Sequence, residues 1–243
     1  MIILRNLTKT YRGIKAVDNL NLHIPKGTIF GFIGPNGAGK TTTIRMMTGV
    51  LRPTSGSIHM NGSDISREPS EVKRMIGYIP DRPFLYEKLS GAEFLRFKAG
   101  LYGIGGERVK EEVEHLMHLF ELSEWSDELI ESYSHGMKQR LIIASALIHR
   151  PQVIIVDEPM VALDPQGAKL VKELFRERAG NGVTVFMSTH TLSLAQEVCS
   201  EIAIVNKGRV VASGTSEELE RQAGVAGDLE RVFLTITGGG TGG

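Results

Sequence analysis

The sequence has little cysteine, no long apolar run and no excess of charge of either sign. It has a single cysteine, Cys199, so an internal disulfide cannot form. A reducing compartment fits this composition, and Cys199 is expected to act as a small buried apolar residue. No apolar run approaches the roughly 18 residues that span a bilayer, and the N-terminus lacks the basic and apolar regions of a signal peptide. We therefore expect a soluble chain, with any membrane spans supplied by another protein.

The charges of the chain balance, since 28 Lys and Arg residues face 28 Asp and Glu residues, for a formal net charge of +0. This balance argues against bulk electrostatic binding to nucleic acid or to anionic lipid. The apolar content is ample, because 41% of the 243 residues are hydrophobic. The chain can therefore bury a sizeable core, as one large domain or two small lobes.

The most specific pattern is GPNGAGKTT at residues 34–42, which fits the G-x-x-x-x-G-K-T phosphate-binding loop. Its glycines tolerate positive φ, so that successive backbone N–H groups can turn around an anion. Lys40 adds a charge for β- and γ-phosphates, and the Thr41 hydroxyl can ligate Mg²⁺. An apolar strand end precedes the loop and a helix start follows it, whose dipole also favours phosphate. This context disfavours a chance glycine-rich turn.

The N-terminal segment predicts strands around this loop. Residues 2–7 alternate weakly, as in an edge strand, whereas residues 16–24 alternate with period two and predict one buried face. Residues 28–33 predict a buried strand that leads into the loop. Tyr11 lies upstream by about the length of a hairpin, where its ring can stack on adenine. Simple packing at a strand edge is an equally good interpretation of Tyr11.

The middle of the chain changes character after a polar break. Residues 72–75 predict a short helix and residues 76–80 a strand, and Asp81 then opens a stretch rich in turn signals. The apolar cluster at residues 84–86 beside this break predicts core packing more than a surface for a partner. From residue 90 to 148 the apolar period is helical. This block therefore predicts a helical lobe inserted into an α/β chain.

Residues 153–158, with the sequence VIIVDE, place two carboxylates after four apolar residues. Such a run predicts a central strand whose carboxyl end opens on a site. Asp157 would hold Mg²⁺, usually through water, and Glu158 can polarise an attacking water. A solvated strand end is the alternative, although paired acids on a dry strand are costly without a cation or hydrogen bonds. His190, which follows the apolar run 183–187, can contact a γ-phosphate, but alone it predicts a structural role.

With these motifs in this order, residues 1–220 resemble the nucleotide-binding subunit of ATP-binding cassette (ABC) transporters. The deciding segment is YSHGMKQR at residues 133–140, which is similar to the signature motif of that family. It carries tyrosine, histidine and methionine where leucine, glycine and glutamine are commoner. Ser134 and Gly136 keep a hydroxyl and a backbone N–H at a helix N-terminus, arranged for an anion. Taken alone, Ser-x-Gly before a helix predicts only an N-cap.

The resemblance implies an α/β fold: a P-loop NTPase (RecA-like) core with an antiparallel β subdomain and an inserted α-helical subdomain. A single ABC ATPase domain would cover residues 1–220, with the core in residues 1–85 and 150–220 and the helical subdomain in residues 86–149. Residues 221–243 would then form a short tail with a flexible glycine-rich end.

The resemblance also implies roles for individual residues and a head-to-tail dimer, in which each ATP lies between one phosphate loop and the partner's signature. The catalytic residues would be Lys40, Asp81, Glu158 and His190, and the Mg²⁺ site Thr41, Asp81 and Asp157. Ala162, Leu163 and Asp164 would cross the dimer interface. The ATP contacts would be Tyr11, Val17, Asn36, Gly37, Ala38, Gly39, Lys40, Thr41 and Thr42, with Ser134, Gly136 and Met137 acting in trans.

One position departs from the family, because Asp81 stands where glutamine is usual. That residue normally reaches Mg²⁺ and the attacking water, and its loop senses the membrane partner. An aspartate can still ligate Mg²⁺, but it adds negative charge near the phosphates and has a shorter reach. We therefore expect Asp81 to keep the coupling role with an altered metal dependence.

The first functional interpretation is the ATP-hydrolysing motor of a transporter, peripheral on the cytoplasmic face of the membrane and bound to a separate permease. The tyrosine-type signature and residues 229–234 resemble exporter-type (ABC-2-type) subunits. A soluble cassette ATPase acting on ribosomes or DNA is the alternative, but such relatives usually carry two cassettes or a long coiled coil, and this chain has one phosphate loop. A small-molecule kinase would have no place for the signature motif or for His190.

Overall fold

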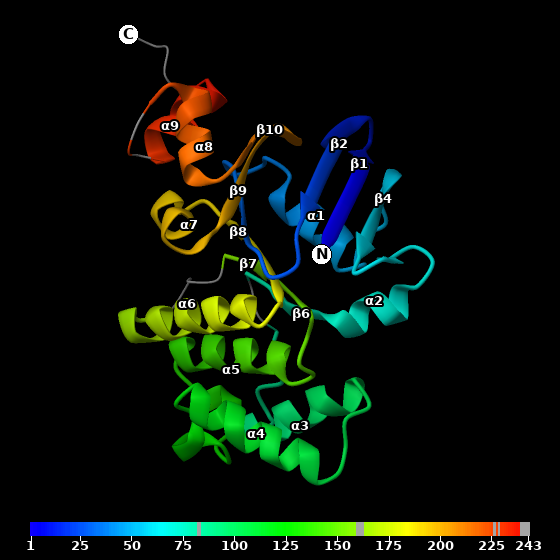
Figure 1. Ribbon diagram of the computed structural model, residues 1–243. Coiled ribbons are helices and arrows are strands. Elements are labelled where there is room, and N and C mark those ends of the chain that lie inside the picture. Colours follow the sequence, from blue (N-terminus) through cyan, green and yellow to red (C-terminus); the bar gives the residue numbers. More distant parts are fainter. Residues whose placement is uncertain (82–83, 159–162, 226, 228, 239–243) are drawn as a thin grey trace.

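The computed structural model describes residues 1–81, 84–158, 163–225, 227 and 229–238. Within these residues the strands form two sheets (Figure 1). The first is antiparallel in the order β2-β1-β4-β5, from β1 (Ile2–Tyr11), β2 (Ile14–Ile24), β4 (Ser55–Met60) and β5 (Ser63–Asp64). The second has the order β10-β9-β3-β8-β7-β6, from β3 (Ile29–Ile33), β6 (Ile76–Ile79), β7 (Val153–Asp157), β8 (Thr184–Thr189), β9 (Glu201–Asn206) and β10 (Arg209–Gly214).

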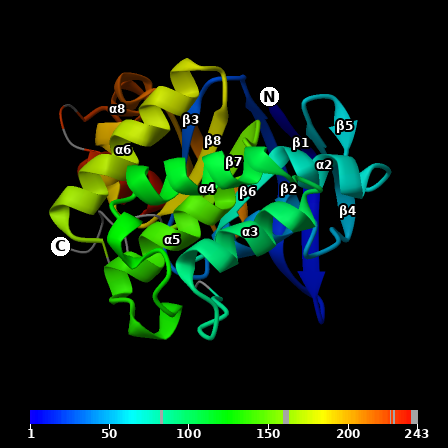
Figure 2. The ribbon, with the colours of Figure 1, turned by 90° about the horizontal axis from the view of Figure 1, so that it is seen from below.

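The helices pack on both sheets. Figure 2 shows α5 and α6 across one face of the larger sheet, with α3 and α4 beyond them. The bounds are α1 (Lys40–Met47), α2 (Pro69–Met75), α3 (Gly91–Leu101), α4 (Glu107–Leu119), α5 (His135–Leu147), α6 (Pro165–Gly180), α7 (Leu192–Val198), α8 (Ser216–Ala223) and α9 (Leu229–Thr237), with short 3₁₀ turns η1 (Ser123–Trp125) and η2 (Ile130–Ser132). None of the helices in the described ranges is long and apolar enough to cross a membrane.

The central strands β3, β7 and β8 are buried along their whole length. They pair in parallel, which accounts for their nearly continuous apolar runs. Alternate residues enter different cores: Ile154 and Val156 pack with the helices α3 to α6, whereas Val153 and Ile155 pack toward the antiparallel sheet and α1. The parallel pairing also brings the carboxyl ends of these strands to one edge, with Asp157 opposite Ser188.

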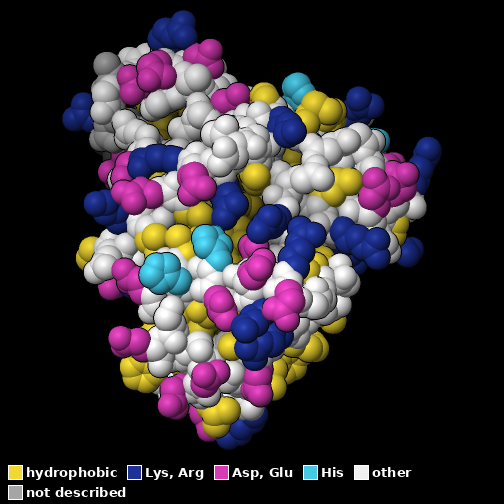
Figure 3. All heavy atoms as spheres, turned by 60° about the horizontal axis from the view of Figure 1, so that its bottom comes forward, with side chains coloured by type: hydrophobic (Ala, Val, Ile, Leu, Met, Phe, Trp, Pro, Cys, Tyr) yellow, Lys and Arg dark blue, Asp and Glu magenta, His cyan; other side chains and the backbone are white. Residues whose placement is uncertain are grey.

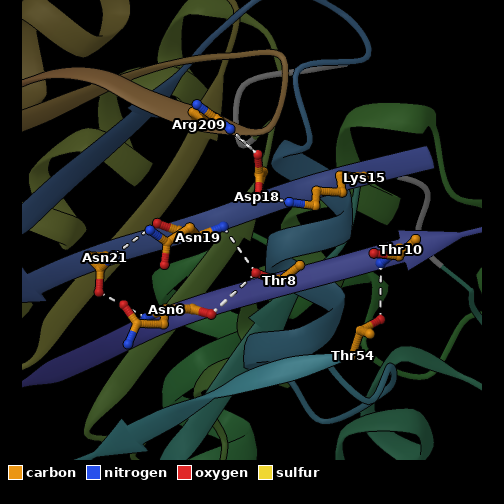
Figure 4. Close-up of polar contacts among 9 residues, drawn as sticks. All are labelled: Asn6, Thr8, Thr10, Lys15, Asp18, Asn19, Asn21, Thr54 and Arg209. Atoms are coloured by element: carbon orange, nitrogen blue, oxygen red, sulfur yellow. Dashed lines mark hydrogen bonds and ion pairs between the residues drawn. The ribbon is translucent and has the colours of Figure 1, made fainter. Parts of the chain in front are cut away.

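Strand β1 lies inside its sheet, between β2 and β4, so the expectation of an edge strand was wrong. Its alternation is weak because bulges interrupt the pairing and because Asn6 takes a positive φ of 48°. Figure 4 shows how side chains satisfy the displaced backbone groups. The Asn6 N–H donates to Asn21 Oδ1 at 2.8 Å, and the Asn19 N–H donates to Thr8 Oγ1 at 3.0 Å. These side chains thus accept hydrogen bonds from backbone N–H groups where the strand pairing is irregular.

Residues 84–86 divide between the core and the surface, so core packing, the preferred expectation, applies to Leu85, whereas the alternative of a surface for a partner applies to Phe84 and Tyr86. Leu85 packs against the core of the helical block, but Phe84 is 75% exposed and Tyr86 is 47% exposed. The two rings stack edge to face on each other, at 5.4 Å between centroids. Their aromatic surface is therefore available to a partner.

The C-terminal segment contains a helix that the apolar pattern did not predict. Helix α9 packs on α7 and α8, and its Leu229 and Val232 are fully buried beside Ile33 and Ile204 of the larger sheet. Figure 1 shows α8 and α9 at the opposite end of the molecule from α3 and α4. The glycine-rich end expected to be flexible is residues 238–243, of which residues 239–243 lie outside the described ranges.

Candidate functional site

The loop between β3 and α1 forms the floor of a cavity of about 340 Å³. Gly39 caps α1 with φ 104°, and an ideal Cβ there would stand 2.5 Å from the Ala16 carbonyl oxygen, so only glycine fits. Ala38 is buried within the loop. The cavity is lined by Ala16, Asn36, Gly37, Gly39, Lys40, Thr41, Thr42, Asp81, Asp157, Glu158 and His190.

Lys40 is folded back onto the loop that carries it. Its Nζ donates to the carbonyl oxygens of Gly34 at 2.6 Å and of Pro35 at 3.2 Å. Burial lowers the pKa of Lys40, while the nearby Glu158 and Asp157 act in the opposite direction. The ammonium therefore stands between loop carbonyls and carboxylates, where an anion would be a favourable further partner.

Asp157 ends β7 and joins three elements. Its Oδ2 accepts a hydrogen bond from Thr41 Oγ1 at 3.2 Å, and its Oδ1 accepts a short one from Ser188 Oγ on β8. The carboxylate is 4% exposed, so these bonds provide the compensation that a buried acid requires. Thr41 and Asp157 thus place two hard oxygen donors side by side at the N-terminus of α1.

Glu158 has a left-handed backbone with φ 55°, an unusual conformation for a residue with a long side chain. Its N–H donates to the Ser188 carbonyl oxygen at 3.0 Å. The carboxylate accepts bonds from Thr189 Oγ1 at 3.2 Å and from the His190 N–H at 3.1 Å, and lies 2.8 Å from His190 Nδ1. Glu158 and His190, both expected to be catalytic, therefore touch each other.

Asp81 lines the same cavity as Asp157 and Glu158, so that three carboxylates share one space. Among the described residues, no group of three or more His, Cys, Asp or Glu side chains is arranged to hold a metal by itself. This arrangement suits a cation that takes only one or two protein carboxylates and completes its shell with phosphate oxygens and water.

Tyr11 and Val17, which were expected to contact ATP, do not line the cavity. Tyr11 is 44% exposed at the end of β1, with Lys9 Nζ 5.3 Å from its ring centroid, and it is outside the cavity lining. Val17 is fully buried beneath Gly39, whereas its neighbour Ala16 lines the cavity. The geometry therefore favours Ala16 over Val17 as a wall of the site, while the stacking of Tyr11 on adenine stays a prediction.

The signature segment lies outside this cavity. Ser134 caps α5, because its Oγ accepts a hydrogen bond from the Met137 N–H at 3.2 Å. Gly136 lies in the first turn of the same helix. One copy of the chain thus leaves Ser134, Gly136 and Met137 away from its own phosphate loop, as an action in trans requires.

The segment expected to cross a dimer interface is described only in part, since Ala162 lies outside the described ranges. Leu163 packs against the helical core, and Asp164 caps α6 by accepting from the Gly167 N–H at 2.9 Å. Arg140 lies on α5, the helix that carries the signature segment and that we call the signature helix. It donates to Asp164 at 3.0 Å and to Glu121 at 2.6 Å. The signature helix and this segment are therefore tied together.

The sequence motifs did not include Ala16, Ser188 and Thr189. Ser188 and Thr189 precede His190. The pairing of β8 with β7 places Ser188 opposite Asp157, and the Thr189 hydroxyl donates to the Glu158 carboxylate. A polar pair at the end of an apolar strand was the available signal for them.

Comparisons with known proteins agree with this geometry. A family profile described as ABC transporter matches residues 17–161. The chain is 37% identical over 230 residues to the daunorubicin resistance ATP-binding protein DrrA3 of Streptomyces coeruleorubidus, covering 95% of this chain and 72% of that protein.

Solved structures give the same picture. The ATP-binding subunit of an ABC transporter superposes with a TM-score of 0.92 at 31% identity, over 98% of this chain and 99% of that one. A dimeric ATP-binding cassette in a post-hydrolysis state, with ADP and phosphate bound, superposes with a TM-score of 0.79 at 27% identity, over 88% of this chain and 98% of that one. The fold class expected from the motifs is thereby confirmed.

Proposed function

This chain belongs to the ABC transporter family, and we propose that it drives the export of a substrate through a separate permease. It is an ATPase subunit of that family, and ATP hydrolysis is its reaction. The observation that carries the residue assignments is the cavity between β3, β7 and β8, which brings together Lys40, Asp157 and Glu158.

The chemistry follows from the positions of the side chains. The loop N–H groups and Lys40 bind the β- and γ-phosphates, and Lys40 then exchanges its loop carbonyls for phosphate oxygens. Thr41, Asp157 and Asp81 would supply oxygen ligands for Mg²⁺, which when bound would neutralise charge that develops on the phosphates. Glu158 accepts a hydrogen bond from the attacking water and orients it. His190, held by Glu158, reaches the γ-phosphate.

The complete site requires two copies of the chain. Ser134 and Gly136 present a hydroxyl and a helix N-terminus away from the cavity of their own subunit. In a head-to-tail dimer they contact the γ-phosphate bound by the partner. A cassette of similar fold is dimeric in a post-hydrolysis state, which supports this arrangement.

Export is favoured by the relatives. A protein named for daunorubicin resistance shares 37% of aligned residues with this chain, and removal of a toxic compound is a direct route to resistance. The substrate path lies in the permease. We place this subunit on the cytoplasmic face of the membrane, where ATP is available.

An aromatic patch offers a surface for the permease. We define it as Phe84, Tyr86 and Phe97, of which Phe84 is 75% exposed. Tyr86 stacks edge to face on both neighbours, at centroid distances of 5.4 Å and 5.3 Å. Phe84 follows Asp81, which lines the cavity, by three positions in the sequence, so a partner on the patch would bind close along the chain to a cavity carboxylate.

Action on nucleic acid is the disfavoured function. Figure 3 shows Lys and Arg side chains gathered across the middle of one face, with acidic and histidine side chains directly beside them. The whole chain has a formal net charge of +0, without the excess of basic residues that is typical of proteins that bind nucleic acid.

The test of the proposed site is Glu158→Gln. The amide keeps the shape of the side chain but is a much weaker acceptor for a proton, so ATP turnover is expected to fall roughly 100-fold or more. ATP binding is expected to persist, and size-exclusion chromatography with Mg-ATP should show a stable dimer, because hydrolysis no longer reopens it. Phosphate release measures the turnover.

The control is Glu131→Gln, since Glu131 pairs with Lys88 in the helical block and is not among the cavity-lining residues. Its turnover should equal that of the wild type. Turnover of Glu158→Gln within a few-fold of the wild type would remove Glu158 from the catalytic role.

A further inference from the structure

The tip of the β9–β10 hairpin rests against the phosphate loop. Asn206 pairs with Arg209 across the two-residue turn Lys207–Gly208, and both turn residues have positive φ, 47° and 79°. An ideal Cβ on Gly208 would stand 2.8 Å from the Ala16 carbonyl oxygen. Glycine is therefore required for the tip to reach this position.

The hairpin tip bonds to the phosphate loop through the backbone. The Gly208 N–H donates to the Ala38 carbonyl oxygen at 2.9 Å. In a planar trans peptide the C=O and N–H groups point in opposite directions. Because the Ala38 carbonyl points to the hairpin, the N–H of Gly39 points to the other side, which is the side of the cavity that Gly39 lines. This bond thus orients an anion-binding N–H group.

Asp18 of β2 bonds to both Gly208 and Arg209 of the hairpin, and Figure 4 shows its contacts with Arg209 and Lys15. Its N–H donates to the Gly208 carbonyl oxygen at 2.9 Å. Its carboxylate accepts bonds from both Nε and a terminal nitrogen of Arg209, the former at 2.8 Å, and from Lys15 Nζ at 2.7 Å. The Asp18 side chain is 11% exposed, whereas that of Arg209 is 68% exposed. The pair therefore ties residue 18 to residue 209 beside the loop.

We propose that Asp18 and Arg209 are positioning residues for ATP binding. Their ion pair fixes the hairpin tip, and the tip, through Gly208, holds the Ala38–Gly39 peptide in the orientation that binds phosphate. Neither residue lines the ATP cavity; both line a separate cavity of about 390 Å³ with Asn19, Asn21 and Val210. Their effect on the phosphates is transmitted through the backbone.

The experiment compares Arg209→Gln and Asp18→Asn with the wild type. Calorimetric titration with Mg-ADP gives nucleotide affinity, and steady-state hydrolysis gives kcat and KM for ATP. We expect Kd for ADP and KM for ATP to rise roughly 5- to 10-fold, the worth of about one well-oriented hydrogen bond, with kcat within two-fold. The double variant should be no worse than the stronger single variant, because both changes release the same turn.

The matched control is Arg150→Gln. Arg150 donates two bonds to Glu112, with exposures of 63% and 10% that resemble those of the Arg209 and Asp18 side chains, but it lies outside the ATP cavity. Arg150→Gln should keep the wild-type Kd and KM. An equal rise in this control, or an unchanged Kd in Arg209→Gln, overturns the proposal. Arg209→Lys, which keeps the charge but loses the paired geometry, should be intermediate.

The inference rests on the proposed function, and the experiment gives different results when the nucleotide site is absent and when only the positioning role is absent. If wild-type protein binds no Mg-ADP, the nucleotide site itself is refuted. If the wild type binds it and Arg209→Gln binds it equally well, only the positioning role is refuted. Urea unfolding of each variant separates a loss of fold from a loss of affinity, and the exposed Arg209 makes a folded variant the expected case.

Discussion

Glu158 is the residue whose conformation is most informative. Its positive φ of 55° costs of order 1–3 kcal/mol in general for a residue other than glycine or asparagine, and such strain persists where surrounding bonds impose it. Here the Ser188 carbonyl, Thr189 Oγ1 and the His190 N–H impose it. Asp157 bonds to Thr41 and Ser188, whereas Glu158 contacts Thr189 and His190, so acids that are adjacent in the sequence have separate partners.

Asp81 gives a prediction at this scale. Three carboxylates line the cavity, and Asp81→Gln removes one negative charge from it. Because an anionic ligand holds a divalent cation more strongly than an amide does, the free Mg²⁺ that gives half-maximal hydrolysis should rise roughly 3- to 10-fold. Phosphate release at fixed ATP over a range of free Mg²⁺ measures this.

The control for Asp81 is Asp127→Asn, an exposed acid in the helical block that does not line the cavity. It should leave the Mg²⁺ dependence unchanged. Superimposable Mg²⁺ curves for Asp81→Gln and the wild type would show that Asp81 has no part in metal binding.

Short sequence motifs predict most of the residues that line the cavity, because the chemistry of phosphate and metal binding restricts both the residue types and their spacing. Asp157 and Glu158 are adjacent to strand signals, and Lys40 and Thr41 have fixed places in the loop. Ala16 was missed because it contributes mainly backbone shape. Ser188 was not predicted as a partner of Asp157, because this contact depends on the pairing of β7 with β8, which no local sequence pattern encodes.

At the scale of elements, His149 joins the helical block to the larger sheet. Its ring stacks on Tyr102 at the end of α3, with 3.7 Å between centroids and 2° between planes. Its Nε2 lies 3.0 Å from the Ile76 carbonyl oxygen of β6. Burial is the main reason why the pKa of His149 is lowered from 6.5 to about 4, with a smaller contribution from the charge of Lys98.

This joint predicts a pH-dependent stability. Between pH 6.5 and about 4 the unfolded chain binds a proton at His149 that the folded chain does not, so the free energy of unfolding falls as the pH falls. The stabilisation is fully present above pH 6.5 and is lost toward pH 4. We expect a loss of about 1–2 kcal/mol, below the full value of the shift, because the ring partly reaches solvent.

The measurement is urea unfolding of the wild type and of His149→Phe at several pH values between 7.5 and 4.5. Phenylalanine keeps the stacking on Tyr102 but does not titrate, so the variant should lose less stability than the wild type over this range. Equal losses in both proteins would assign the acid sensitivity to other groups.

Elements with strong periodicity were predictable, and those set by tertiary contacts were not. The buried strands β3, β7 and β8 are continuous apolar runs that reflect parallel pairing on both sides. Strand β1 looked like an edge because its bulges weaken the alternation. Helix α9 buries Leu229 and Val232 against α7 and the sheet. These contacts are with distant parts of the chain, so the short segment alone does not predict them.

At the scale of the whole molecule, we propose two surfaces of different use. We assign the cavity to ATP and the signature helix α5 to a second copy of the chain, and the aromatic patch begins three residues after Asp81 in the sequence. An exposed Phe beside a Tyr is costly to leave in water, and large aromatics are enriched where proteins meet. We therefore propose that the patch is the contact for the permease.

Phe84→Ser tests this assignment, and Ile14→Ser is its matched control, because the two side chains are 75% and 74% exposed. Each tagged variant, expressed in the source cell, is captured from detergent-solubilised membranes, and co-purified proteins are identified. Wild type and Ile14→Ser should retain a polytopic membrane protein in near-equal amount, whereas Phe84→Ser should lose most of it while its ATPase rate stays within two-fold. Since an anchor ring at an interface is worth about 2 kcal/mol or more, the loss should be roughly 30-fold in affinity. Equal recovery with Phe84→Ser would move the permease contact elsewhere, and ribosomal or DNA-bound partners without a membrane protein would favour the soluble cassette ATPases.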